Sequence, residues 1–329
     1  MNNIVILGAG GMGTLFAARL LRGGNKNVYL INHNPDYVES VNRRGILFRD
    51  SGGDTPIPAR AFRSAGELAG EMDGPADLVI LFVKSISNRE AVESARCITG
   101  PDTYFLTLQN GLGNPESIAE TGVVSPDHIL FGKTTEGGTL VGPGIVFHKA
   151  EGHNSATVFM PFSGPVTEEI AAIAALLRDC GIRAECSRDA ELAIWEKVMM
   201  NCVGSSLAAL LRMSTKSALS CESGLAIARA VTAEVVAVAQ KKGVPLTPEM
   251  AEDVIRRLSG NDLQASMGKD VLSLKQTEIG TLNGAISKFG KELGIPTPAN
   301  DLLYQMICTL QSNYEKTWDL GGAPAVCLH

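Results

Sequence analysis

The chain has 329 residues, of which 45% are hydrophobic and 19% are charged, and its formal net charge is −6 at pH 7. This length exceeds what one hydrophobic core usually serves, so we expect two domains in a protein of globular composition. The negative charge disfavours nucleic acid or an anionic membrane surface as the main partner, and no apolar run reaches the ~20 residues that span a bilayer.

The first residues predict a strand, a glycine-rich turn and a helix. Residues 4–7 form a short apolar run typical of a buried parallel strand, and the apolar residues of 14–21 have helical spacing. Between these elements lies a G-x-G-x-x-G fingerprint, which consists of Gly8, Ala9, Gly10, Gly11, Met12 and Gly13. In this context the turn places a pyrophosphate at the helix N-terminus, where free N–H groups and the dipole favour an anion. We therefore expect residues 8–13 to bind a dinucleotide.

The end of the next strand, expected at residues 28–31, bears on the type of cofactor. A carboxylate at this place would bind the ribose hydroxyl of NAD, whereas a basic residue favours the phosphate of NADP. The sequence here is Asn32-His33-Asn34, without an acidic residue. We therefore expect NADPH (NADP+) as the cofactor, with His33 or Asn34 donating to its phosphate.

Two further strands end in polar residues that would meet at one edge of a parallel sheet. Lys84 follows the apolar run of residues 77–83, and Gln109-Asn110-Gly111 follows the run of residues 104–108. Ligands of open α/β sheets collect at the carboxyl ends of the strands, so we expect Lys84 to contact a phosphate or ribose and Asn110 to orient a nicotinamide or a substrate. The alternatives are a solvated loop lysine and a structural Asn-Gly turn.

The first half closes with late strands and a helix. Residues 145–148 and 156–160 have strand patterns and are expected to pair with each other in antiparallel orientation. His148 lies on the first of them, where a structural histidine is favoured over a catalyst. A helix over residues 168–180 follows, ended by Gly181. The expected fold class is α/β, with a Rossmann NADP-binding domain over residues 1–187.

The pattern changes at about residue 188, where strands give way to long helical segments. After a first helix, further helices are expected over residues 222–242, 248–258, 270–293 and 299–314, and Thr247 suits the N-cap of the second of these. Residues 188–329 are therefore expected to form an all-helical substrate and catalytic domain. This half offers a surface for a homodimer, although no pattern in it specifies one.

Two general expectations concern location and metals. The chain begins with a strand pattern rather than a signal peptide, so we expect a cytoplasmic protein. The seven cysteines are scattered, without CxxC or His/Cys pairs, so no metal site is predicted.

The first helix of the second half carries a polar stripe. Lys197, Asn201 and Ser205 recur every four residues among Val, Met, Leu and Ala, so they lie along one helix face. Burying such groups is costly unless a neighbouring segment or a small polar ligand satisfies them. For Lys197 taken alone, a lysine on the helix surface is the simpler interpretation.

Four stretches together resemble one family, the ketopantoate reductases (2-dehydropantoate 2-reductases). They are residues 8–13, Leu108-Gln109-Asn110-Gly111, Trp195-x-Lys197-x-x-x-Asn201, and Ser266-Met267-x-x-Asp270 with Thr277-Glu278-Ile279 and Asn283-Gly284. The resemblance spans nearly the whole chain. It implies a Rossmann domain, a helical domain and a cleft between them in which NADPH reduces ketopantoate to (R)-pantoate, a step of pantothenate and coenzyme A synthesis.

The resemblance also implies roles for single residues. Lys197 matches the family's catalytic lysine, which protonates the carbonyl oxygen as hydride arrives, and Glu278 matches its glutamate. Hydride addition builds negative charge on oxygen, which a nearby ammonium stabilises and then protonates. The implied substrate is a small 2-oxo acid. The side chains expected to contact it are those of Asn201, Ser205, Ser266 and Asn110.

The sequence departs from the family pattern at three positions. Ser205 stands where the family has a second asparagine, four residues after the first. Gly280 stands where an aspartate usually follows the Thr-Glu-Ile motif, and His33 stands where an arginine is common after the second strand. Three hypotheses therefore remain: a ketopantoate reductase, a related NAD(P)H-dependent reductase of another 2-oxo acid, and a non-catalytic dinucleotide-binding redox sensor. Retention of Lys197 with Glu278 disfavours the sensor, which needs no proton donor. An interdomain salt bridge is the other interpretation of that pair.

Overall fold

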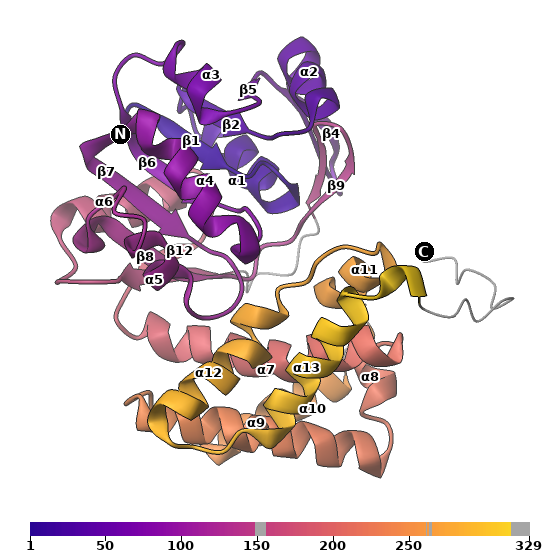
Figure 1. Cartoon of the computed structure of the whole chain (residues 1–329). Coiled ribbons are helices and arrows are strands. Elements are labelled where there is room, and N and C mark those ends of the chain that lie inside the picture. The colour runs from indigo at the N-terminus through magenta and orange to yellow at the C-terminus, as the bar shows by residue number, and fades with distance from the viewer. Residues whose placement is uncertain (149–155, 261, 263–264, 317–329) are drawn as a thin grey trace, which may run out of the picture. The chain divides into compact units, whose positions relative to one another are not determined.

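The computed structural model describes residues 1–148, 156–260, 262 and 265–316 (Figure 1). The chain divides into two compact units, Met1–Val198 and Met199–His329. The first unit is α/β, and the described part of the second is helical, as the sequence predicts. The division falls within helix α7 (Ala190–Leu211), whereas the boundary expected from the sequence lies just before this helix and stays a prediction.

An eight-stranded sheet forms the centre of the first unit. Its strand order is β12-β11-β8-β7-β6-β1-β2-β5, and all pairs are parallel except β11 with β8. The strands are β1 (Ile4–Leu7), β2 (Val28–Ile31), β5 (Arg60–Phe62), β6 (Ala76–Leu81), β7 (Thr99–Thr107), β8 (Ile129–Thr134), β11 (Thr157–Pro161) and β12 (Ala184–Cys186). The predicted strands at residues 4–7 and 28–31 are confirmed, and those at 77–83 and 104–108 overlap β6 and β7.

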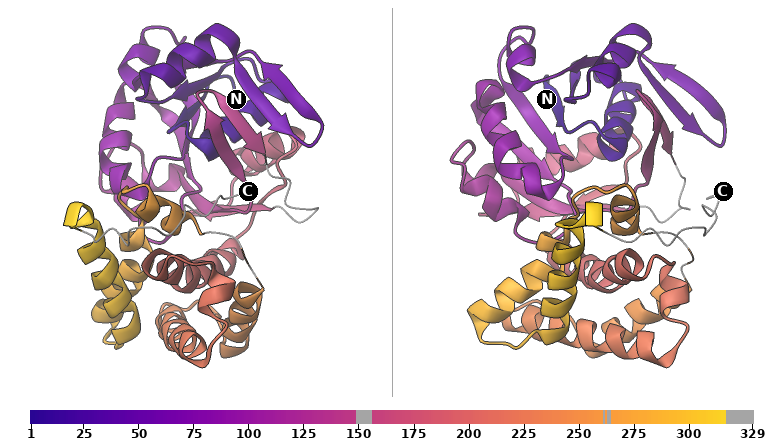
Figure 2. Two further views of the ribbon diagram at one scale, coloured as in Figure 1. Left: turned by 90° about the vertical axis from the view of Figure 1, so that its right-hand side faces the viewer. Right: turned by 45° about the vertical axis from the view of Figure 1, so that its right-hand side comes forward.

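Helices cover both faces of this sheet (Figure 2). They are α1 (Gly11–Arg22), α2 (Pro35–Arg44), α3 (Ala65–Ala69), α4 (Asn88–Ser94), α5 (Asn114–Ala119) and α6 (Glu168–Asp179), with short 3-10 turns η1 (Ser85–Ser87), η2 (Ala95–Ile98) and η3 (Pro126–His128). Ile4 and Ile6 of β1 pack with α1 and α6, whereas Val5 and Leu7 point to the face that α3, α4 and α5 cover. A strand buried on both faces must be apolar throughout, which explains the uninterrupted run of β1.

A second, four-stranded sheet was not expected from the sequence. Its order is β4-β3-β10-β9, with β3 (Ile46–Asp50), β4 (Gly53–Ile57), β9 (Gly138–Gly142) and β10 (Ile145–His148). The predicted pairing of residues 145–148 with 156–160 is wrong, because β10 pairs with β9 and β3, and β11 pairs with β8 and β12. Only Pro143 and Gly144 connect β9 to β10, so this hairpin forms locally. Helix α1 contacts both sheets.

The helical unit continues from α7 through a series of helices. They are α8 (Thr215–Ala218), α9 (Glu222–Lys241), α10 (Pro248–Ser259), α11 (Ser266–Leu272), α12 (Asn283–Leu293) and α13 (Pro298–Gln311), with 3-10 turns η4 (Ile279–Thr281) and η5 (Tyr314–Lys316). Thr247 caps α10 as predicted, because its hydroxyl accepts a hydrogen bond from the backbone N–H of Met250.

The single helix expected over residues 270–293 is wrong, because the chain breaks there into α11, η4 and α12. Leu274 has φ of 54°, in the left-handed region that ends a helix. Gln311 of α13 then accepts hydrogen bonds from the backbone and the hydroxyl of Thr277, at 3.1 and 2.9 Å. These tertiary contacts outweigh the helical pattern of the segment.

Candidate functional site

The glycine turn between β1 and α1 has space for a ligand at one position and close packing at two others. A Cβ at Gly8, whose φ is 96°, would lie 2.5 Å from the backbone nitrogen of Val83, and one at Gly13 would lie 2.5 Å from the carbonyl oxygen of Gly8. At Gly10, no described atom lies within 4 Å of the corresponding position. Gly8 and Gly13 therefore serve the packing of the turn, whereas Gly10 leaves room for a group to approach the backbone.

The N-terminus of α1 suits an anion. Gly10 is its N-cap, no described side chain caps it, and no acidic residue lies in its first turn. The helix dipole and the N–H groups at such an end favour a negatively charged group. Together with the open space at Gly10, these features fit the pyrophosphate of a dinucleotide.

The residues after β2 have different surroundings. The Nδ2 of Asn32 donates to the carbonyl oxygen of Ala9 at 2.8 Å, and Asn34 is the N-cap of α2, where its side-chain oxygen accepts from the N–H of Asp36. His33, which lies between them, is exposed. The structure therefore leaves the His33 side chain at the end of β2 open to solvent.

The loops after β6 and β7 are joined by a network of amide side chains. Lys84 and Asn110, both half-buried, lie in these two loops. Gln109 donates through Nε2 to the carbonyl oxygen of Val83 at 2.5 Å and to Asn88 at 2.6 Å. The amide chain continues from Asn88 to Asn114 and from Asn114 to the carbonyl oxygen of Asn110. The network fixes the two loops at the carboxyl edge of the sheet, so Lys84 and Asn110 are held on neighbouring strand ends.

Sequence reasoning missed the two asparagines of this network. Asn88 and Asn114 are 1% and 3% exposed, and each is the first residue of the helix that follows a sheet-edge loop. Their position in the sequence could have indicated this role. A buried amide directly after a strand-end loop has backbone and side-chain groups of the loops within hydrogen-bonding reach.

Lys197 reaches the same edge of the sheet from helix α7. Its Nζ donates to the carbonyl oxygen of Thr134 at 2.9 Å, and the side chain is half-buried. Thr134 is the last residue of β8, which runs parallel to β7. The carboxyl ends of parallel strands meet at one edge of the sheet. The Lys197 amine therefore lies at the same edge as the carboxyl ends of β1, β6 and β7. Lys197 is therefore hydrogen-bonded to the sheet rather than freely solvated.

The other predicted site residues belong to the second unit. Asn201 and Ser205 follow Lys197 at four-residue steps along α7, and Asn201 is half-buried whereas Ser205 is only 4% exposed. Ser266 is exposed at the start of α11. Glu278 is half-buried directly before η4, where its backbone carbonyl accepts from the hydroxyl of Thr281 at 3.1 Å.

A buried contact ties the segment after Glu278 to α7. Asn283, the first residue of α12, is fully buried and donates to the carbonyl oxygen of Cys202 at 3.1 Å. Ser206 in turn donates to Asn283 at 2.6 Å. The motif residue Asn283 therefore anchors α12 to α7, which restricts the position of the segment that carries Glu278.

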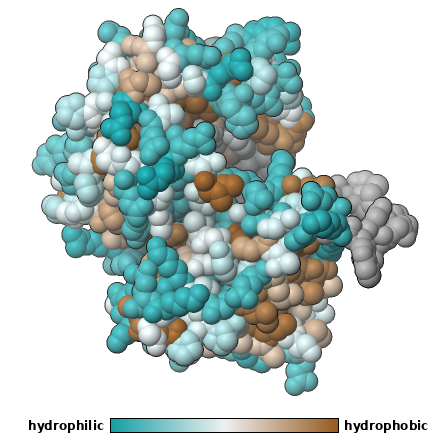
Figure 3. All heavy atoms as spheres, viewed as in Figure 1, coloured by the Kyte–Doolittle hydropathy of each residue, from teal (hydrophilic) through white to brown (hydrophobic). Residues whose placement is uncertain are grey.

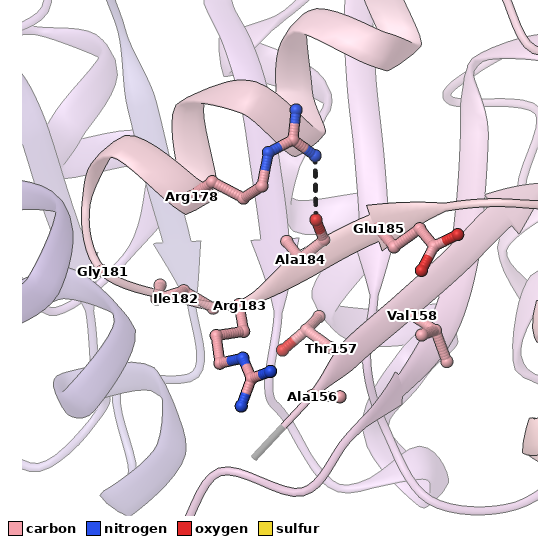
Figure 4. Close-up of a pocket in the computed structure, with 9 residues that line it drawn as sticks. All are labelled: Ala156, Thr157, Val158, Arg178, Gly181, Ile182, Arg183, Ala184 and Glu185. Carbon is pink, nitrogen blue, oxygen red and sulfur yellow. Dashed lines mark hydrogen bonds between the residues drawn. The ribbon is translucent and has the colours of Figure 1, made fainter. Parts of the chain in front are cut away.

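A cavity of about 450 Å³ lies elsewhere, beside β11 and β12 (Figure 4). Its lining residues are Ala156, Thr157, Val158, Arg178, Gly181, Ile182, Arg183, Ala184 and Glu185. Arg178 donates across it to the carbonyl oxygen of Ala184 at 2.9 Å. This lining includes none of the predicted site residues, so the cavity is separate from the candidate site.

Family models match both parts of the chain. Residues 4–162 match the model described as ketopantoate reductase PanE/ApbA, and residues 189–311 match the model of the C-terminal part of the same family. The chain belongs to the ketopantoate reductase family. The resemblance inferred from the four sequence stretches is thereby confirmed, and with it the class of oxidoreductases.

Individual ketopantoate reductases and related structures agree with this assignment. The 2-dehydropantoate 2-reductase of Halobacterium salinarum is 28% identical over 308 residues, which cover 92% of this chain and 97% of the relative. The PanE/ApbA family ketopantoate reductase of Ralstonia eutropha JMP134 has a TM-score of 0.85 at 26% identity, covering 95% of this chain and 99% of its own. A D-mandelate dehydrogenase with NADH and anilino(oxo)acetate has a TM-score of 0.83 at 24% identity, with 95% and 99% coverage, and shows the fold alone.

No described helix is long and apolar enough to cross a membrane. Among the described residues, no group of three or more His, Cys, Asp or Glu side chains could hold a metal ion.

Proposed function

We propose that this protein reduces 2-dehydropantoate (ketopantoate) to (R)-pantoate with NADPH, with Lys197 as the general acid. The observation that carries the proposal is the hydrogen bond from Lys197 Nζ to Thr134 at the carboxyl edge of the sheet, the edge where the glycine turn follows β1. The name and extensive coverage of the Halobacterium salinarum relative support the substrate.

The bound nicotinamide would supply the hydride. Residues 8–13 would hold the pyrophosphate at the α1 N-terminus, and His33, Lys84 and Asn110 would contact the rest of the cofactor. These side chains follow β2, β6 and β7, whose carboxyl ends are where ligands of such sheets bind. His33 is proposed to donate to the ribose phosphate, since no carboxylate follows β2 to favour the free hydroxyl of NADH.

Lys197 would act on the ketone oxygen. As hydride adds to the carbonyl carbon, the C=O π electrons move to oxygen, and the ammonium of Lys197 stabilises that charge and transfers a proton to it. The product is the 2-hydroxy acid, and the lysine is left neutral until it takes a proton from solvent. Glu278 is proposed as the second catalytic residue. Asn201, Ser205, Ser266 and Asn110 are proposed as neutral donors to the substrate.

Another 2-oxo acid is the second candidate substrate, and the residue that favours it is Ser205. Ser205 replaces the second family asparagine and is 4% exposed, so it offers a shorter side chain than the family pattern at that point of α7. A shorter side chain leaves room for a different 2-oxo acid. A panel of 2-oxo acids, assayed with NADPH and with NADH, compares this candidate with ketopantoate.

The test of the proposed function is NADPH oxidation on addition of ketopantoate. Lys197→Ala should lower kcat by about 10²–10⁴-fold, the usual contribution of a positioned proton donor, while retaining the affinity for NADPH. Lys216→Ala, which removes an exposed lysine of α8, is the matched control and should keep the wild-type rate. An unchanged kcat in Lys197→Ala would refute the mechanism. If the panel showed much faster reduction of another 2-oxo acid, that acid would replace ketopantoate as the proposed substrate.

A further inference from the structure

The carbonyl oxygen of Ala9, in the middle of the glycine turn, accepts hydrogen bonds from two side chains. Asn32 donates through Nδ2 at 2.8 Å from the end of β2, and Thr14 donates through its hydroxyl at 3.2 Å from the first turns of α1. Ala9 and Thr14 are both fully buried. The turn is thus held on two sides by groups that the G-x-G-x-x-G pattern does not contain.

A third side chain extends this arrangement to helix α2. The hydroxyls of Thr14 and Tyr37 lie 2.7 Å apart, and Tyr37 is 2% exposed. Since the single hydroxyl hydrogen of Thr14 goes to Ala9, Tyr37 is the donor in this contact. The hydrogen bonds therefore run from Tyr37 through Thr14 to the Ala9 carbonyl.

The orientation of the Asn32 amide is fixed by its second contact. Its Oδ1 accepts from the backbone N–H of Asn34 at 2.9 Å, while its Nδ2 faces the Ala9 carbonyl. A flipped amide would place oxygen against oxygen and N–H against N–H, so only one assignment satisfies both neighbours. The side chain of Asn32 thus points back to the turn.

We infer that Asn32 is a positioning residue for the dinucleotide site, and that it does not discriminate between NADPH and NADH. The inference rests on the proposed function, because it concerns the cofactor of that reaction. In many dinucleotide-binding folds, a carboxylate at the end of this strand binds the ribose and selects NAD. Here the side chain at that place, Asn32, donates a hydrogen bond to the backbone of the glycine turn. The next residue, His33, is exposed.

The substitution Asn32→Asp separates the two roles because it keeps the shape and removes the donor. A carboxylate oxygen would then face the Ala9 carbonyl oxygen, an acceptor against an acceptor, and the turn would shift away from the geometry that binds a pyrophosphate. Discrimination at the ribose predicts the opposite result, a gain in NADH binding relative to NADPH.

The experiment measures the dissociation constants of NADPH and NADH by fluorescence titration, without a substrate. Asn32→Asp should weaken both by about tenfold, the effect expected from losing one of the two hydrogen bonds to the Ala9 carbonyl, with the NADPH to NADH ratio changed less than about threefold. Asn32→Ala, which adds no charge, should weaken both less. In turnover, the KM for the cofactor should rise while kcat at saturating cofactor stays within about twofold, a split that general loss of folding would not give.

Asn42→Asp is the matched control. The Asn42 amide also bonds a backbone carbonyl and a backbone N–H, both of Ala61 at 2.8 Å, but away from the glycine turn. It should leave both dissociation constants unchanged, and thermal unfolding of each variant reports on folding. A selective gain for NADH in Asn32→Asp, or unchanged affinity in both Asn32 variants, would overturn the inference and leave the proposed function standing. Wild-type protein that binds neither cofactor would refute the proposed function itself.

Discussion

The carboxylate of Glu136 lies 3.0 Å from Nε2 of His148, and the two side chains are only 6% and 10% exposed. His148 also stacks on Phe48, and the Nη2 of Arg19 lies 3.4 Å from its Nε2. Glu136 follows the strand end that accepts the Lys197 amine, and Gly138, two residues later, lies against Gly11 of α1. This buried pair therefore fixes the segment between the lysine contact and the glycine turn, which agrees with the structural role favoured for His148.

Removing the carboxylate should destabilise the protein. Glu136→Ala leaves the buried imidazole of His148 without its carboxylate partner, and an unsatisfied buried polar group costs about 1–3 kcal/mol of unfolding free energy. Glu136→Gln should cost less, because its amide oxygen still accepts from the imidazole. Urea unfolding measures both variants, and Asp54→Ala, which breaks an exposed pair with Arg49, is the control and should leave the midpoint unchanged. Equal midpoints for Glu136→Ala and Asp54→Ala would contradict this structural role.

The glycines of the turn should separate binding from folding. Gly10→Ala adds a methyl group where no described atom lies within 4 Å, so the unfolding temperature should stay near wild type while cofactor affinity falls at least about tenfold. Gly13→Ala places the methyl group 2.5 Å from the Gly8 carbonyl and should cost about 2 kcal/mol of stability. Calorimetry and cofactor titration of both variants are the measurements. Wild-type affinity in Gly10→Ala would contradict the assignment of this turn to the cofactor.

The local part of this site could be predicted from the sequence, because glycines and an apolar run encode a strand, a turn and a helix within residues 4–21. The hydrogen-bond partner of Lys197 could not be predicted from the sequence. It is a backbone carbonyl 63 residues away, and no pattern of side chains identifies such an acceptor. The second sheet was missed for two reasons. Four of the five residues of β4 are exposed, which erases its apolar alternation, and β10 pairs with β3, which lies about a hundred residues earlier. Similarly, the break at Leu274 depends on the contact of Thr277 with Gln311, which periodicity cannot show.

Exposed apolar side chains in the helical unit bear on the expected homodimer. The large apolar side chains that are exposed on the described part of this unit are Leu211, Met213, Ile227, Leu272, Leu274, Leu302 and Met306. Figure 3 shows apolar side chains gathered over part of the helical unit in this view. Burying such a surface would favour self-association. The homodimer stays a prediction, and sedimentation at several protein concentrations measures it: a single monomeric species throughout would contradict it.

The cysteines should differ sharply in reactivity. Cys202 is fully buried, and burial raises the pKa of its thiol, so the nucleophilic thiolate is suppressed. Cys97 and Cys221 are exposed. A maleimide reagent at neutral pH should therefore label Cys97 and Cys221 in the native protein and Cys202 only after unfolding, as mapped by mass spectrometry of peptides. Early labelling of Cys202 would show that the α7 core opens readily, contrary to its packing.

Tyr37 should make stability depend on pH in the alkaline range. Burial raises the pKa of its phenol above the ordinary value of 10.0, because the ionised form would lose its hydration. The folded protein therefore keeps the phenol protonated, whereas the unfolded chain loses this proton above about pH 10. The stabilisation is fully present below that pH and is lost as the pH rises further, because the unfolded state then binds fewer protons.

Tyr37→Phe isolates this effect because the ring remains and the titrating hydroxyl does not. Near neutral pH the variant should lose about 1 kcal/mol of unfolding free energy with the hydrogen bond to Thr14. Between about pH 9 and pH 11, its urea midpoint should fall less steeply than that of the wild type, so the two curves converge. Parallel curves would mean that Tyr37 ionises equally in both states, and the buried contact that holds Thr14 against the glycine turn would then not persist in solution.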